Sequence, residues 1–207
     1  MQNSRPWQLP YSRLLRFWHW ATFLVVLLLL FTVFTGKYFV DSDSTGRLLQ
    51  AEAKQQGIVL APGVAQRLAH PIEEPVWELH TVLGYVLTGL FLLRIVAEFT
   101  ERSPQRLSTR IRLLLTLRGS NPEARRTLRV QYIYVLFYAL LAGIAGTGLW
   151  LAFNEDNRDF AQVHDVKEWH EKGFWALLLF IAIHLAGVLR AERRARPGVV
   201  SSMINGK

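Results

Sequence analysis

The chain of 207 residues contains no cysteine. This absence excludes a disulfide framework, an iron–sulfur cluster held by thiolates and a haem attached through thioether bonds. Any redox centre must therefore be held by other ligands. The long apolar runs also lack proline, whereas transporters typically contain spanning helices broken by glycine or proline. A haem-free transporter or metal carrier is thus an alternative that the sequence disfavours.

Hydrophobic residues make up 51% of the chain and gather in four runs. Each run has roughly the 20 residues that a membrane-spanning helix needs. We therefore predict an all-α integral membrane protein with four transmembrane helices, at residues 13–40, 76–99, 130–153 and 168–190. Residues 1–207 would form a single transmembrane domain, with an outer loop at 41–75 and a basic cytoplasmic loop at 100–129.

The first apolar run contains a stretch, Ala21–Phe34, that is similar to the apolar core of a signal peptide. No small-residue cleavage pattern follows it, and the apolar run continues to Val40. We therefore expect a retained helix.

The basic residues lie in alternate connections. Arginines crowd the amino-terminal tail, the second connection and the carboxyl-terminal tail, whereas the first and third connections are rich in acids. The positive-inside rule then places both termini in the cytoplasm. A basic surface against anionic lipid accounts for the net charge of +8 without nucleic acid as a partner.

Four of the six histidines fall within the predicted spans, and they pair by depth. These four are His19, His80, His170 and His184. His170 and His184 are fourteen residues apart, which places them about 21 Å apart along one helix and on nearly the same face. Since the chain alternates direction, His19 shares the inner depth with His184, and His80 shares the outer depth with His170.

Each pair joins two helices, as a ligand set that clamps a flat cofactor from both sides requires. Neutral imidazole is a good iron ligand, and coordination satisfies a nitrogen that lipid would leave bare. We therefore predict two haems, one held by His19 and His184 and one by His80 and His170. Without cysteine both would be b-type.

Three further residues fit this arrangement. Gly84 lies one turn after His80 and leaves room for a porphyrin face. Arg94 lies fourteen residues after His80, at inner depth, and an intramembrane arginine needs an anionic partner such as a haem propionate. Arg16, one turn before His19, has the same potential role.

Other interpretations of these residues stay open. An intramembrane histidine often forms a hydrogen bond between helices, and Arg94 has the length to extend to the interface. A zinc or copper site is disfavoured because the pairs are far apart and no carboxylate or cysteine accompanies them. His70 and His164 lie outside the predicted spans, and the sequence assigns them no role.

Several motifs resemble one known family. "RLLRFWHW" opens the first helix, "ELHTVLGY" and "LLRI" lie in the second, "EWHEKGFW" and "AIHL" lie in the fourth, and "GSNP" and "VSSMINGK" lie outside the spans. Together they are similar to the bacterial dihaem cytochrome b-561 family, and most of all to the cytochrome b subunits of membrane-bound nickel–iron hydrogenases. The resemblance implies two haems b in a four-helix bundle, with His19, His80, His170 and His184 as ligands.

The resemblance also implies a function. In the bacterial inner membrane, such a subunit transfers electrons between a periplasmic redox partner and quinone, the mobile substrate in the membrane. The partner would be a hydrogenase, a cytochrome c or another dehydrogenase. We expect no catalytic residues of the hydrolytic kind. A stand-alone cytochrome b-561 that oxidises superoxide and reduces quinone is the alternative, although acidic outer connections would repel that anion.

Overall fold

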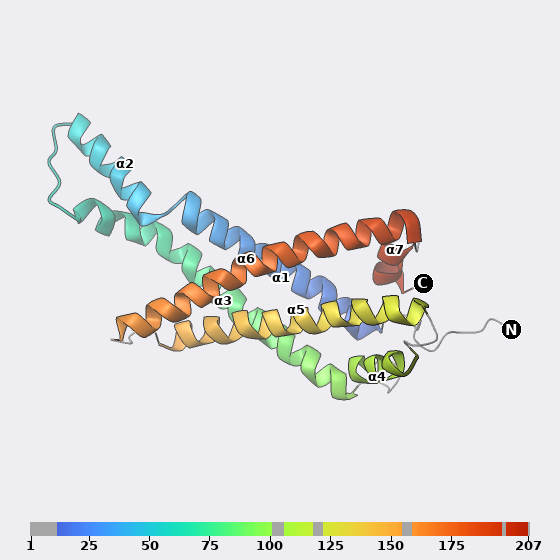
Figure 1. Ribbon diagram of the computed structural model, residues 1–207. Helices are drawn as coiled ribbons and strands as arrows, with labels where there is room; N and C mark the ends of the chain where they lie inside the picture. The colour runs from blue at the N-terminus through green and yellow to red at the C-terminus, as the bar shows by residue number, and fades with distance from the viewer. Residues whose placement is uncertain (1–11, 101–105, 118–121, 155–158, 196–197, 207) are drawn as a thin grey trace. The chain divides into compact units, whose positions relative to one another are not determined.

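The computed structural model describes residues 12–100, 106–117, 122–154, 159–195 and 198–206 (Figure 1). Within these residues every regular element is helical. In chain order they are α1 (Arg13–Tyr38), α2 (Ser42–Gln55), α3 (Val64–Thr100), α4 (Leu107–Leu117), α5 (Pro122–Phe153), α6 (Phe160–Arg190), the π-helical turn η2 (Ala191–Ala195) and α7 (Val199–Asn205).

Four of these helices, α1, α3, α5 and α6, are long and apolar enough to cross a membrane. At 1.5 Å per residue, even the 26 residues of α1 extend about 39 Å, more than the roughly 30 Å of a hydrocarbon core. Large apolar side chains such as Phe31, Leu136 and Leu179 point outward and are more than half exposed. Such helices suit lipid as their surroundings. The prediction of an all-α fold with four helices of membrane-spanning length is therefore confirmed for the described residues.

Helical structure extends beyond the predicted spans. α3 begins twelve residues before the predicted start at residue 76, and α5 and α6 begin at Pro122 and Phe160, not at residues 130 and 168. α2 occupies much of the predicted outer loop 41–75. A run of apolar residues predicts only the stretch of a helix that is suited to lipid. The polar turns that lengthen the same helix at its ends are not part of that run. Asp159 caps one such extension by accepting a hydrogen bond from the Gln162 N–H at 3.1 Å.

The chain folds as two compact units. One unit comprises residues 22–87, and the other comprises residues 1–21 with 88–207. Both α1 and α3 contribute to the two units.

In the unit of residues 22–87, α2 packs against the first turns of α3. Ala65 and Ala69 of α3 are buried, and Gly46 of α2 lies against Gln66. The Glu73 carboxylate accepts hydrogen bonds from the Ser42 N–H at 3.0 Å and from the Ser42 hydroxyl. α3 continues through Pro71 and Pro75, although each proline removes a backbone hydrogen bond and crowds the preceding turn.

In the other unit, α5 packs against both α4 and α6 (Figure 1). Phe137 of α5 stacks on Phe180 of α6 with ring centroids 4.8 Å apart. Gly173 of α6 permits a close approach, because an added Cβ would lie 2.7 Å from the Ile144 side chain. Trp18, at the start of α1, is buried against α5. These contacts fix the helices that carry three of the four span histidines.

Candidate functional site

The structure brings His19 of α1 and His184 of α6 together. Their ring centroids lie 6.2 Å apart, with an angle of 57° between the ring planes. A metal–imidazole bond is about 2 Å long, so two rings that clamp one metal ion have centres about 6 Å apart. The His184 ring also stacks on Phe180, at 6.0 Å and 8°. The separation of these rings therefore fits a pair of axial ligands on one iron.

The other two span histidines lie in different units. His80 belongs to the unit of residues 22–87, and His170 belongs to the other. The pairing of His80 with His170 stays a prediction.

The hydrogen bonds of Thr32 indicate which ring nitrogen of His80 carries the proton. The Thr32 hydroxyl donates to the Leu29 carbonyl at 2.8 Å and lies 2.8 Å from His80 Nδ1. A hydroxyl has a single proton to donate, so with that proton on Leu29 the oxygen accepts from a protonated Nδ1. The lone pair of neutral His80 is then on Nε2.

His170 has the same arrangement with Thr147 of α5. The Thr147 hydroxyl donates to the Gly143 carbonyl at 2.8 Å and lies 3.0 Å from His170 Nδ1. The same proton count indicates that Nδ1–H donates to Thr147 and that Nε2 carries the lone pair, and the His170 ring also has a hydrogen bond with the Ile144 backbone. Metal-binding histidines generally donate their second ring N–H in this way, which fixes the tautomer and the ring orientation.

Glycine next to His170 leaves room for its ring. A Cβ on Gly148 would lie 3.0 Å from His170 Cε1 and 3.6 Å from Nδ1. Around Gly84, the residue predicted to give space to a porphyrin, an added Cβ would meet no atom within 4 Å. The open space at Gly84 is compatible with its predicted role, while Gly148 is the glycine that touches a candidate ligand.

Arg16 lies one turn before His19 in α1 and has a spare donor. Its Nη1 donates to the Ile204 carbonyl at 2.9 Å. Its Nε is buried and has no hydrogen-bond partner. A buried donor without an acceptor is costly. An anionic group such as a haem propionate would satisfy it, so this orphaned N–H one turn from His19 fits the predicted haem.

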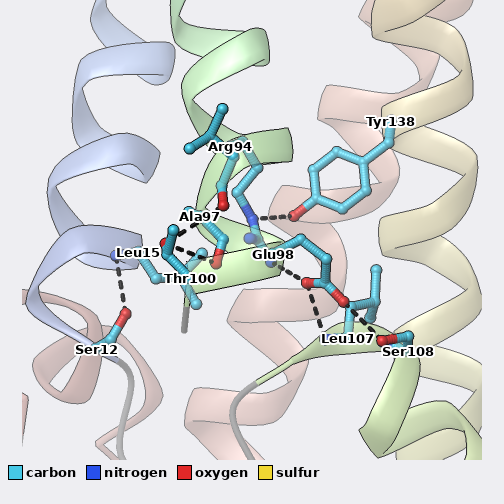
Figure 2. Close-up of polar contacts among 10 residues, drawn as sticks. Ser12, Leu15, Arg94, Ala97, Glu98, Thr100, Leu107, Ser108 and Tyr138 are labelled. Atoms are coloured by element: carbon cyan, nitrogen blue, oxygen red, sulfur yellow. Dashed lines mark hydrogen bonds and ion pairs between the residues drawn. The ribbon is translucent and has the colours of Figure 1, made fainter. Parts of the chain in front are cut away.

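Arg94 is buried, with 7% of its surface exposed, and it has protein partners (Figure 2). Its Nε donates to the Tyr138 hydroxyl at 3.0 Å, and its Nη2 lies 3.4 Å from a carboxylate oxygen of Glu98. Glu98 in turn accepts from the backbone N–H groups of Leu107 and Ser108, at 3.0 and 2.9 Å, and so caps α4. Arg94 thus has an anionic partner in its own helix, and its contact with a propionate stays a prediction.

Across the part of the chain that the structure describes, no group of three or more histidine or carboxylate side chains gathers around a common point. His70 and His164 lie near the starts of α3 and α6, away from the apolar stretches.

Comparison with known proteins gives a consistent set of matches. The family model described as prokaryotic cytochrome b561 matches residues 10–206. Three similar curated proteins are each named as a probable Ni/Fe-hydrogenase B-type cytochrome subunit. The protein of Bradyrhizobium diazoefficiens is 31% identical over 43% of this chain and 39% of its own length. Those of Cupriavidus necator and Azotobacter chroococcum are 24% and 26% identical, over 95% of this chain and 84% and 86% of their own lengths. No solved structure matches the chain significantly.

Proposed function

The chain belongs to the prokaryotic cytochrome b561 family, and from this premise we propose that it is the dihaem cytochrome b subunit of a membrane-bound oxidoreductase. It is a multi-pass membrane protein, and its family implies b-type haem. The proposed function is electron transfer between a periplasmic redox partner and the membrane quinone pool. The observation that carries it is the approach of His19 and His184, whose rings lie 6.2 Å apart between two spanning helices.

The proposed ligand sets are those that the depths of the histidines predict. His19 and His184 would hold the inner haem, and His80 and His170 would hold the outer haem. Bound haem supplies reversible one-electron chemistry at iron. The protein sets the spacing of the two groups, excludes water and tunes their potentials through the ligands and nearby charges. The Nδ1–H donations to Thr32 and Thr147 support Nε2 as the ligand atom of His80 and His170.

Charge distribution supports an orientation with both termini in the cytoplasm of a bacterial inner membrane. The second connection and the carboxyl-terminal tail are rich in arginine, and the first and third connections are acidic. The outer haem would then face the periplasm, and the whole chain would act as one transmembrane domain. The names of the relatives favour a hydrogenase as the periplasmic partner.

The full chain, purified in mild detergent from its native membrane, tests this function. We expect two haems b per chain, hydrogenase subunits in the same preparation, and haem that hydrogen reduces and a soluble quinone analogue reoxidises. A preparation without haem b would overturn the proposal. Rapid superoxide oxidation by the isolated subunit, with quinone reduction and no partner, would instead favour the stand-alone alternative.

Thr147 offers a prediction about the outer haem. Thr147→Val keeps the shape of the side chain but removes the hydroxyl that lies 3.0 Å from His170 Nδ1. Loss of such a bond typically weakens metal binding about 10–100-fold, and a less basic imidazole favours ferrous iron and raises the potential. We therefore expect faster haem loss to excess apomyoglobin, and a higher potential, for one haem. Thr147→Ser keeps the hydroxyl and should behave as the wild type; equal behaviour of Val and Ser would contradict the assigned role.

A further inference from the structure

The carboxyl-terminal segment forms a short helix that turns back from the end of α6 (Figure 1). Glu192 of η2 fixes its start by accepting hydrogen bonds from the backbone N–H groups of Gly198 and Val200, at 2.8 and 3.2 Å. At its end Gly206 adopts a left-handed conformation, with φ +75°, and donates to the Ser202 carbonyl at 3.0 Å. Both ends of α7 are therefore held in place.

The last carbonyls of α7 hold two side chains from the start of α1. Arg16 Nη1 donates to the Ile204 carbonyl at 2.9 Å, and Trp20 Nε1 donates to the Met203 carbonyl at 3.3 Å. Carbonyls at a helix carboxyl end lack partners in their own helix, and arginine is well suited to cap them. These two side chains flank His19 in the sequence, and the Trp20 ring lies edge-on to the His19 ring at 5.5 Å.

Gly206 is needed here for two reasons. Its positive φ is a conformation that residues with a Cβ rarely adopt. A Cβ at this position would also lie 2.8 Å from Arg16 Cζ and 2.9 Å from Arg16 Nη1. The glycine thus lets the Arg16 guanidinium rest directly on the backbone at the end of α7.

We propose that residues 198–206 are a positioning element for the inner haem, which hold Arg16 and Trp20 beside His19 and thereby set the potential of that haem. This inference rests on the proposed function. Two nitrogens of Arg16 have different roles in this proposal. Nη1 anchors the side chain on α7, and the buried Nε–H can donate to a haem propionate.

The direction of the effect follows from charge. Ferric haem carries one more positive charge than ferrous haem, so a fixed cation nearby favours the ferrous form and raises the potential. Displacing the guanidinium into water weakens this interaction, because water screens charges far better than the protein interior does. Loss of the contact with α7 should therefore lower the potential of the inner haem.

Gly206→Ala in the full chain tests the proposal by potentiometric titration of both haems. The inner haem is identified as the one that His184→Ala removes. We expect its ferrous-to-ferric ratio at a fixed potential to fall about tenfold, a shift of about 59 mV for one electron, while the outer haem is unchanged. Gly57→Ala is the matched control, because Gly57 has φ +77° and an added Cβ there meets no atom within 4 Å; it should shift neither haem.

Two further variants separate positioning by α7 from a general loss of structure. A chain that ends at residue 197 lacks the acceptor carbonyls without introducing a clash, and it should show the same shift. Arg16→Gln should lower the same potential, and Gly206→Ala should then add nothing in that background. Unchanged potentials in a variant that still binds two haems would overturn this inference alone. Equal shifts of both haem potentials, or additive shifts from Arg16→Gln and Gly206→Ala, would overturn it as well. Absence of haem from the wild type would overturn the proposed function itself.

Discussion

Replacement of His184 by alanine is expected to remove one of two haems and leave the other in place. A b-type haem has no covalent attachment, so axial ligation and packing must hold it. His184 has both relevant features, because its ring faces His19 at 6.2 Å and stacks on Phe180. Without it, His19 is left as a single ligand in a site that has lost part of its wall. The haem-to-protein ratio from a pyridine haemochromogen assay should fall by about half.

His164→Ala is the control for this experiment. His164 lies in the same helix, near its start and away from the apolar stretch. We expect its loss to leave the haem content and the reduced-minus-oxidised spectrum unchanged. Retention of both haems by His184→Ala, or an equal loss in the two variants, would contradict the assignment of His184 as a ligand.

Replacement of Gly148 by leucine is expected to remove the other haem. Even the first side-chain carbon would lie 3.0 Å from His170 Cε1, a separation tighter than nine in ten Cβ contacts in proteins. The remaining carbons of leucine need space next to the same ring, so the imidazole must move. Its movement breaks the hydrogen bond from Nδ1–H to Thr147 and turns Nε2 away from the position that the bond now fixes.

Gly146→Leu provides the matched control, two residues earlier in the same helix. A Cβ on Gly146 would meet no atom within 4 Å, and the residue is exposed. Helix propensity, hydrophobicity and added volume change equally in the two variants. We therefore expect Gly146→Leu to keep both haems while Gly148→Leu keeps one. Equal haem content in the two variants would show that contact with His170 is not what makes Gly148 necessary.

The four spans could be predicted from the sequence because hydrophobicity over about 20 residues is a local property. The polar extensions could not, since they depend on packing between segments. α3 begins at Val64, and Gly46 of α2 lies against Gln66 in its first turn. No pattern in residues 64–75 predicts that contact. The two prolines in this stretch instead favour a helix that starts after Pro75, because local preference opposes what tertiary contacts stabilise.

The approach of His19 and His184 could be anticipated from the sequence, whereas the contacts that hold the rings of His80 and His170 could not. Depth and helical face predict that His19 and His184 lie at one level, and the structure brings their rings together. Thr32 and Thr147 give no comparable signal, because threonine is common in apolar helices and usually bonds to its own backbone. The run of small residues around Gly148 indicates close helix packing, but not that His170 is the neighbour.

The contacts of the carboxyl-terminal tail were also beyond sequence reasoning. The tail contributes to the resemblance as a motif, but Arg16 and Ile204 are 188 residues apart and interact through a backbone carbonyl. A backbone acceptor has no residue-specific signature. On α7, the glycine at 206 is a position whose identity reflects the contact with Arg16.

The central claim is that the four span histidines hold two haems in the pairs His19 with His184 and His80 with His170. Electron paramagnetic resonance of the oxidised protein, recorded for the wild type and four single His→Ala variants, tests it most directly. The account predicts two low-spin bis-imidazole signals in the wild type, with the same one lost in His19→Ala and His184→Ala and the other lost in His80→Ala and His170→Ala. Loss of different signals from the two members of either pair, or a wild type without low-spin haem, would contradict it.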